Sequence, residues 1–274
     1  MTQDERRIYL IKALLAERAD DEKIVVPEDA DDQRALLRAL MNVRPPAPVA
    51  AEMLAVQGAY LAERLHERGG AVDAEALPPV DAADPVLSRV ALWHGDITRL
   101  AADAIVNAAN DQLLGCFVPG HHCIDNAIHT YAGMQLRLDC ARLMATQGHA
   151  EPAGQVKVTR AYNLPSGLVF HTVGPIVQGG RPTLRDEAFL ASCYRACLAE
   201  ATTRGLSTLA FCCISTGIFG FPQEEAARIA LDAILDHLTH HDQRLKVIID
   251  VFLDTDQRIY QELLDRARAA CRRA

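Results

Sequence analysis

The sequence contains no apolar run that approaches the roughly 18 consecutive residues typical of a membrane-spanning helix. Its first ten residues, MTQDERRIYL, carry charges from residue 4, which is not the pattern of a secretory signal peptide. A basic surplus is also absent, since 28 Lys and Arg stand against 36 Asp and Glu and give a net charge of −8. This balance disfavours nonspecific binding to nucleic acid or anionic membranes. We therefore expect a cytoplasmic protein with no nucleic-acid and no membrane partner.

Several catalytic signatures are missing as well. The spacings of the Walker P-loop and of the G-x-G-x-x-G fingerprint are absent, which argues against those two modes of nucleotide binding. There is no G-x-S-x-G nucleophile elbow, so a serine hydrolase is not supported. The H-x-E and P-C-x-x-C pattern of zinc deaminases is also absent, which disfavours base deamination.

The eight cysteines are spread over 274 residues. Without an export signal, this distribution predicts reduced thiols rather than a disulfide framework. Cys116 and Cys123 lie together in a loop rich in glycine and histidine. The others lie in segments with helical or strand patterns, where a cysteine is most often a small buried apolar residue: Cys140, Cys193, Cys197, Cys212, Cys213 and Cys271.

The hydrophobic pattern changes near residue 88. Residues 1–88 carry helical stripes and no strand signal, and they end in the acidic connector AVDAEALPPVDAADP; the helices are expected at 5–17, 31–43 and 49–68. In residues 89–274, short apolar runs alternate with helical patterns. The strands are expected at 90–94, 104–107, 155–161, 168–173, 208–214 and 246–253, and the helices at 125–147, 184–204, 222–240 and 255–272. This alternation predicts an α/β sheet covered by helices on both faces.

Two loops that follow expected strands carry polar side chains. In an open α/β sheet, ligands usually bind at the carboxyl ends of the strands. Asp96, in WHGDITRL, either caps the following turn or accepts from a ligand amine. Asn107 and Asn110, in IVNAAND, place two amides at the end of a strand, although asparagines in turns often bond their own backbone.

A third loop, CISTGIFGFP at 213–222, joins an apolar strand to a helix. Its small residues Ser215, Thr216, Gly217 and Gly220 allow backbone N–H groups to point outward as a nest for an anion such as phosphate. The alternative is a tight strand-to-helix turn that binds no ligand.

The sharpest signal is the loop GCFVPGHHCIDN at 115–126. Cys116, His121 and Cys123 form a C-x4-H-x-C group, three ligands of the kind that zinc prefers. Three protein ligands with one open position are typical of a catalytic rather than a structural zinc. The alternatives are two reduced cysteines beside a histidine, or a redox pair.

Asp125 and His129 follow this loop at the start of a helix. They are four residues apart and therefore share one face of it. Asp125 either caps the helix or, beside a metal, orients or deprotonates a water molecule. For His129, a partly buried helix histidine is the favoured interpretation over a catalyst.

Taken in order, these segments resemble the macrodomain family. GDIT, IVNAAN, CIDNAIH, LVFHTVGP and CISTGIFGFP followed by PQEEAARIA match that family from about residue 90 to 270. Where familiar hydrolytic macrodomains carry a run of glycines, this chain has GCFVPGHHC, which resembles the zinc-containing macrodomain subfamily. The resemblance implies a three-layer fold, with a mixed β-sheet between helices at 89–274, and an all-helical extension with its connector at 1–88.

The resemblance also implies roles for particular residues in binding ADP-ribose. Asp96 would hold the adenine amino group with help from the Ile97 backbone, and Asn110 would face the distal ribose. Phe252 is a candidate to stack on adenine. The diphosphate would be wrapped by Ser215, Thr216, Gly217, Ile218 and Phe219, with Phe219 or Phe221 against the sugar. The implied zinc ligands are Cys116, His121 and Cys123, and the neighbouring His122 is the alternative histidine.

The function implied is a zinc-dependent protein-ADP-ribosyl hydrolase. It would remove mono-ADP-ribose from modified protein side chains, with a carboxylate linkage to Asp or Glu expected by family analogy. Zinc would orient the substrate or activate water, with Asp125 and Asn110 as catalytic residues. A different class remains open, namely a noncatalytic ADP-ribose reader with a structural zinc. Hydrolysis of a small ADP-ribose derivative is a third possibility.

Overall fold

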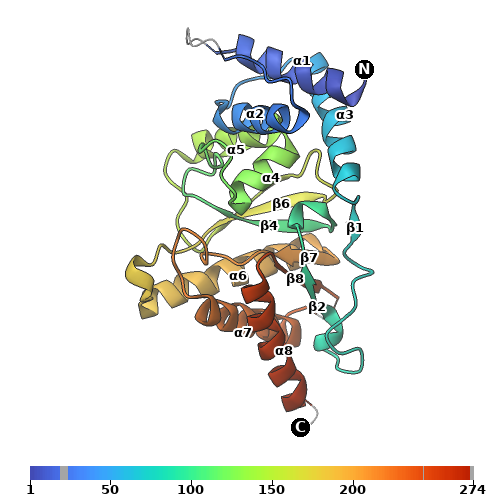
Figure 1. Cartoon of the computed structure of the whole chain (residues 1–274). Helices are drawn as coiled ribbons and strands as arrows, with labels where there is room; N and C mark the ends of the chain where they lie inside the picture. Colours follow the sequence, from blue (N-terminus) through green and yellow to red (C-terminus); the bar gives the residue numbers. More distant parts are fainter. Residues whose placement is uncertain (19–23, 243, 272–274) are drawn as a thin grey trace.

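The computed structural model in Figure 1 describes residues 1–18, 24–242 and 244–271. Its centre is a mixed six-stranded sheet in which only β5 runs antiparallel to its neighbour β6. In spatial order the strands are β2 (Val90–His94), β8 (Lys246–Val251), β7 (Thr208–Phe211), β4 (Ala104–Ala109), β6 (Leu168–Val173) and β5 (Val156–Arg160). The predicted strands are therefore present, and the inner ones are almost completely buried.

Helices cover both faces of this sheet, as the sequence predicted. One side carries α4 (Ile124–Ala132) and α5 (Met134–Gln147), and the other carries α6 (Leu184–Arg204), α7 (Gln223–His240) and α8 (Asp254–Cys271) (Figure 1). Three short 3-10 turns complete this part: η1 (Leu87–Arg89), η2 (Ile97–Arg99) and η3 (Gln178–Gly180). Residue 272, the predicted last residue of the final helix, lies outside the described residues. None of the helices in the described ranges combines the length and apolar content needed to span a bilayer.

The N-terminal helices form a second apolar cluster. They are α1 (Gln3–Ala16), α2 (Ala30–Val43) and α3 (Ala51–Glu67). In Figure 1, α1 and α2 lie beyond α4 and α5, and α3 runs down the side of the molecule toward β1 (Val72–Asp73). Their buried side chains pack on one another and on Met134 of α5: Leu10, Ile11, Leu14, Leu37, Leu40, Met41, Met53, Tyr60 and Leu61. The domain boundary at 88/89 stays a prediction. One strand was missed in this segment, because β1, which pairs with β3 (Leu100–Ala101), is too short to give an alternating pattern.

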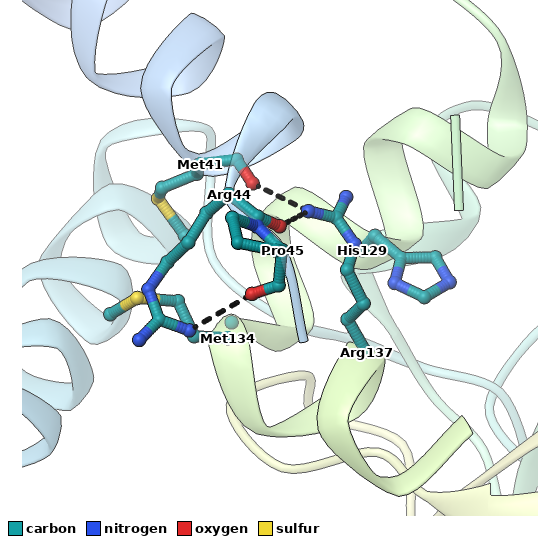
Figure 2. Close-up of a pocket in the computed structure, with 7 residues that line it drawn as sticks. Met41, Arg44, Pro45, His129, Met134 and Arg137 are labelled. Carbon is teal, nitrogen blue, oxygen red and sulfur yellow. Dashed lines mark hydrogen bonds between the residues drawn. The ribbon is translucent and has the colours of Figure 1, made fainter. Parts of the chain in front are cut away.

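The side chain of Arg137 joins α5 to the end of α2. Its guanidinium donates to the carbonyl oxygens of Met41 and Arg44, as Figure 2 shows, and to that of Leu114 at 2.7 Å. The last carbonyl groups of a helix have no partner within the helix, so this contact satisfies polar groups that would otherwise be buried and unpaired. Because burial dominates, the pKa of Arg137 is lowered to about 10, which leaves the group charged at neutral pH.

All eight cysteines are free thiols in the structure, in line with the prediction of reduced cysteines. Five of the six that were expected in helices or strands are buried or half-buried. Cys271 is the exception, because the last turn of α8 leaves it exposed.

The single helix predicted over 125–147 is wrong, because Gly133 divides it into α4 and α5. Gly133 has φ +93°, a conformation that residues with a Cβ rarely adopt. A Cβ at this position would also lie 2.4 Å from Nε2 of Gln57. The Gln57 side chain accepts from the Met134 amide at 2.9 Å and donates to Gln135, so α3 caps the start of α5. The break is set by a contact between distant segments.

Replacing Gly133 with alanine is expected to reduce the free energy of unfolding by about 3 kcal/mol, from the positive φ and the clash with buried Gln57. Gly148→Ala is the comparison at an ordinary left-handed position, since Gly148 has φ +75° and ψ 8° with nothing within 4 Å of an added Cβ, whereas Gly133 has ψ 179°. The loss for Gly148→Ala should be about 1 kcal/mol. Urea denaturation of both variants gives the comparison, and equal losses would contradict a special role for the Gln57 contact.

Candidate functional site

A cleft of about 900 Å³ lies at the carboxyl ends of β2, β4, β7 and β8. The parallel strands end at the same edge of the sheet, so the loops that follow them meet there. Most residues proposed from the sequence for the site line this cleft: Asp96, Ile97, Asn110, Cys116, His121, Cys123, Asp125, Ser215, Thr216, Gly217, Ile218 and Phe219. Asn107, Gly220 and Phe221 are not among its lining residues.

At one end of the cleft, Asp96 follows β2. It caps η2 by accepting from the Thr98 amide at 3.0 Å, as its structural interpretation predicted. It also accepts from Arg68 Nη1 at 2.6 Å, and the Arg68 guanidinium lies 3.5 Å from the ring centre of Tyr131. Capping and ligand binding do not exclude one another, because the carboxylate still lines the cleft.

Sequence reasoning missed Asp250, which lines the same cleft from β8. Neither of its carboxylate oxygens has a hydrogen-bond partner among the described residues. Burial, with a further contribution from the charge of Asp96, raises the pKa of Asp250 well above its ordinary value. A lone acid in the apolar run KVIIDVFL was the available signal. Phe252, two residues further on, is 71% exposed and lines the cleft rather than packing in the core.

The loop at 213–222 presents unpaired backbone amides. The N–H groups of residues 215–219 donate no hydrogen bond within the described part of the chain, whereas Gly220 and Phe221 close the loop through bonds to Gly217 and Ser215. Ser215 adopts φ +66°, and the facing Gly174 leaves room for it, since a Cβ there would lie 2.0 Å from Ser215 Oγ. A row of free N–H groups is a ready site for an anion. Phe221 is buried in the core.

The 115–126 loop brings Cys116, His121 and Cys123 together. Their ligand atoms all lie within 4.8 Å of one another, and Cys116 Sγ is 3.4 Å from His121 Nδ1. Tetrahedral zinc with ordinary bond lengths separates a sulfur and a nitrogen ligand by about 3.6 Å. Two thiols and an imidazole at this spacing therefore fit a metal. His122 is exposed and lies outside this group, so the geometry favours His121 over it.

The thiol of Cys123 is poorly suited to ionise without a cation. Burial is the main reason that its pKa is raised to about 12, and the neighbouring Cys116 adds to the shift. A divalent cation reverses this preference, because it binds the thiolate and releases the proton. The group is thus built from ligands that a soft metal can use.

Asp125 lies beside this group and is 5% exposed. Asn107 donates to its Oδ1 at 2.8 Å, and Asn110 contacts its Oδ2 at 3.4 Å. Burial raises the pKa of Asp125 to about 6, against the opposing effects of the Asn107 bond and the charge of Arg137. A carboxylate with this pKa is a stronger base than an ordinary aspartate while still ionised at pH 7.

Beneath Asp125 lies a buried group made of His129, Cys140 and His171. His171 contacts Asn107 through Nδ1 at 3.1 Å and Thr159 through Nε2 at 2.9 Å, so both ring nitrogens are already used. Burial lowers the pKa of His171 to about 4 and that of His129 well below its ordinary value. We therefore interpret this group as a neutral core that supports Asn107, which agrees with the buried interpretation of His129.

Comparison with known proteins places the chain in a family. Residues 106–230 match the family model described as Macro domain. The chain is 46% identical to a protein-ADP-ribose hydrolase of Treponema medium over 96% of this chain and 100% of that one. It is 45% identical to a protein-ADP-ribose hydrolase of Staphylococcus aureus strain Mu50, over 94% of each chain.

Solved structures agree with this placement. A Trypanosoma brucei macrodomain in complex with ADP-ribose superimposes with a TM-score of 0.65 at 30% identity, covering 88% of this chain and 100% of that one. An Oceanobacillus iheyensis macrodomain with ADP gives 0.60 at 38% identity, covering 66% and 92%. The chain belongs to the macrodomain family. Within that family it is a hydrolase.

The low pKa of His171 predicts a pH dependence of stability. The unfolded chain takes up a proton near pH 6.5 and the folded protein only near pH 4, so the stability present above pH 6.5 is lost as the pH falls. Between pH 7 and pH 5 this loss is about 2 kcal/mol. The free energy of unfolding of His171→Gln, measured by urea denaturation, will differ from that of the wild type at pH 7. At pH 5 this difference should be smaller by about 2 kcal/mol. A constant gap for His171→Gln would refute the assignment.

Proposed function

We propose that the protein is a zinc-dependent hydrolase that removes mono-ADP-ribose from modified protein side chains, with aspartate or glutamate as the linked residue. The observation that carries the proposal is the meeting of three features in one cleft. These are the Cys116–His121–Cys123 group, the buried Asp125 carboxyl and the unpaired amides of residues 215–219. The protein-ADP-ribose hydrolases of Treponema medium and Staphylococcus aureus support it.

ADP-ribose would lie along the cleft with its base at the Asp96 end. The Asp96 carboxylate accepts from the adenine amino group and the Ile97 backbone adds a contact, with Phe252 beside the base. The free amides of residues 215–219 hold the diphosphate, because aligned N–H dipoles favour an anion. This direction brings the distal ribose to Asn110 and Asp125, next to the cysteine and histidine ligands.

The bond broken joins the anomeric carbon of the distal ribose to the side-chain oxygen of the modified protein. Water supplies the hydroxyl group to that carbon, and its proton ends on the departing carboxylate or in solvent. Asp125 orients this water and accepts its proton, for which a pKa of about 6 is suited at neutral pH. Asn107 and Asn110 fix the direction of the Asp125 carboxylate.

A zinc ion held by Cys116, His121 and Cys123 would supply an electrophilic centre that attracts oxygen ligands and makes water more acidic. The Asp125 carboxyl follows Cys123 by two residues on the first turn of α4. The helix start therefore fixes the position of the carboxylate relative to the ligand group.

The metal ligands can be tested with two neighbouring histidines. His121→Ala is expected to lower the zinc content from one ion per chain to less than about 0.2, since two remaining ligands bind weakly. His122→Ala should keep its zinc, because that exposed side chain lies outside the group. Elemental analysis after dialysis measures both. A chelator should abolish release of ADP-ribose from modified protein, and added zinc should restore it. If His122→Ala loses its zinc and His121→Ala keeps it, the zinc ligand is His122 and not His121.

The role of Asp125 can be separated from binding. Asp125→Asn keeps the size of the side chain but removes the base, so kcat should fall by about 10²- to 10⁴-fold. The Kd for ADP-ribose, measured by calorimetry, should change less than about threefold, because the groups proposed to bind its base and diphosphate are unchanged. Unchanged turnover would remove Asp125 from the mechanism. A wild-type protein that binds ADP-ribose but releases none from any linkage would instead be a reader with a structural zinc.

A further inference from the structure

The 115–126 loop has few hydrogen bonds of its own. Two involve the ligand atoms, namely the Cys116 Sγ–His121 Nδ1 contact and the Asn126 amide that donates to Cys123 Sγ, both at 3.4 Å. Within the loop, the His121 amide donates to Val118 O at 3.2 Å, and the side chain of Asn126 donates to the same carbonyl at 3.2 Å. Phe117 and Val118 are exposed. A loop held this loosely must be ordered before it can bind an ion, and that ordering weakens binding. Its conformation therefore depends on contacts from outside the loop.

Asn110 and Arg137 hold the start of the loop, through Gly115 O and Leu114 O. The contacts to its turn at Gly120 and His121 come from α2, which packs against α4. Arg38 and Asn42 are four residues apart and so share one face of this helix. Arg38 donates to the carbonyl oxygen of His121 at 3.2 Å, and its Nη2 and Nε reach Asn126 Oδ1 at 2.9 and 3.2 Å. The Arg38 guanidinium thus bonds both the backbone of His121, a proposed metal ligand, and the first turn of α4.

Asn42 holds the other side of the same turn. Its Oδ1 accepts from the Gly120 amide at 3.2 Å, and its Nδ2 donates to Thr130 Oγ1 at 3.0 Å. Gly120 adopts φ +66°, which turns the chain toward His121. Asn42 is 1% exposed and Asn126 is fully buried. Any shift of the loop would leave buried amide groups without partners, so this arrangement is strongly preferred.

We propose that Arg38 and Asn42 are positioning residues for the metal ligands, so that α2 completes the ligand site without touching the ion. The inference rests on the proposed zinc site. Removing a residue that hydrogen-bonds to a metal ligand typically weakens metal binding by about 10- to 100-fold. The N-terminal helices thereby act on the chemistry of the cleft as well as on the stability of the fold.

The test is the zinc affinity of the full chain, measured by competition with a chromophoric chelator on metal-stripped protein. Arg38→Ala should weaken zinc binding by about 10- to 100-fold. Arg38→Lys should lie between it and the wild type, because a lysine keeps the charge but cannot reach His121 O and Asn126 Oδ1 together. Arg34→Ala is the matched control on α2, since Arg34 pairs with Asp31 and has no hydrogen bond or ion pair to the described loop residues. Its affinity should equal that of the wild type.

Urea denaturation of the metal-free variants distinguishes positioning from a general loss of stability. Each measured affinity is corrected for the fraction of metal-free protein that is folded. A purely structural role would lower the free energy of unfolding and leave the corrected affinity unchanged, which would overturn the inference. Asn42→Ala removes a deeply buried side chain, so the Arg38 series remains decisive if this variant does not fold. If the wild type itself binds no zinc, the proposed zinc-dependent function is wrong. If the wild type binds zinc and Arg38→Ala binds it equally tightly, only the proposed role of α2 is wrong.

Discussion

The arrangement of the site depends on the hydrogen bonds of the buried Arg137 guanidinium. It bonds the Leu114 carbonyl at the start of the 115–126 loop and the Met41 and Arg44 carbonyls at the end of α2, and it lies over the Phe117 ring. A charge at this depth is stable only when its N–H groups are satisfied. The loop and α2 must therefore keep their mutual position. The same charge lies near enough to Asp125 to lower its pKa against the larger effect of burial.

Asp125 shows how the sheet and the helices share control of one functional group. Its position comes from the first turn of α4, whereas its two amide partners, Asn107 and Asn110, come from the end of β4. Asn107 is in turn bonded to His171 on β6, whose neutral ring accepts this contact because burial keeps the proton off. The carboxylate is therefore oriented by a chain of buried polar contacts that ends at Thr159 on β5.

Much of this site could be predicted from the sequence, because its residues follow strands whose apolar pattern is strong. Asp96, Asn110 and the 213–222 loop come directly after β2, β4 and β7, and parallel strands bring such loops to one edge. The break at Gly133 could not be predicted, since it depends on Gln57 at a distance of many residues along the chain. The role of Arg38 could not be predicted either, because its partner Asn126 lies 88 positions away along the chain.

The proposal that an acidic chain binds an anionic ligand needs a local explanation. The cleft is lined by the acids Asp96, Asp111, Asp125, Asp250 and Asp256, which by simple count would repel a diphosphate. Burial reduces this repulsion, because it raises the pKa of Asp250 well above its ordinary value and so favours the uncharged form of that group. The Arg68 guanidinium offsets Asp96. What faces the ligand is then a row of free amides and, in the proposed holoprotein, a divalent cation. At distances of a few ångströms in a confined cleft these outweigh a net charge spread over the surface, which solvent and salt screen.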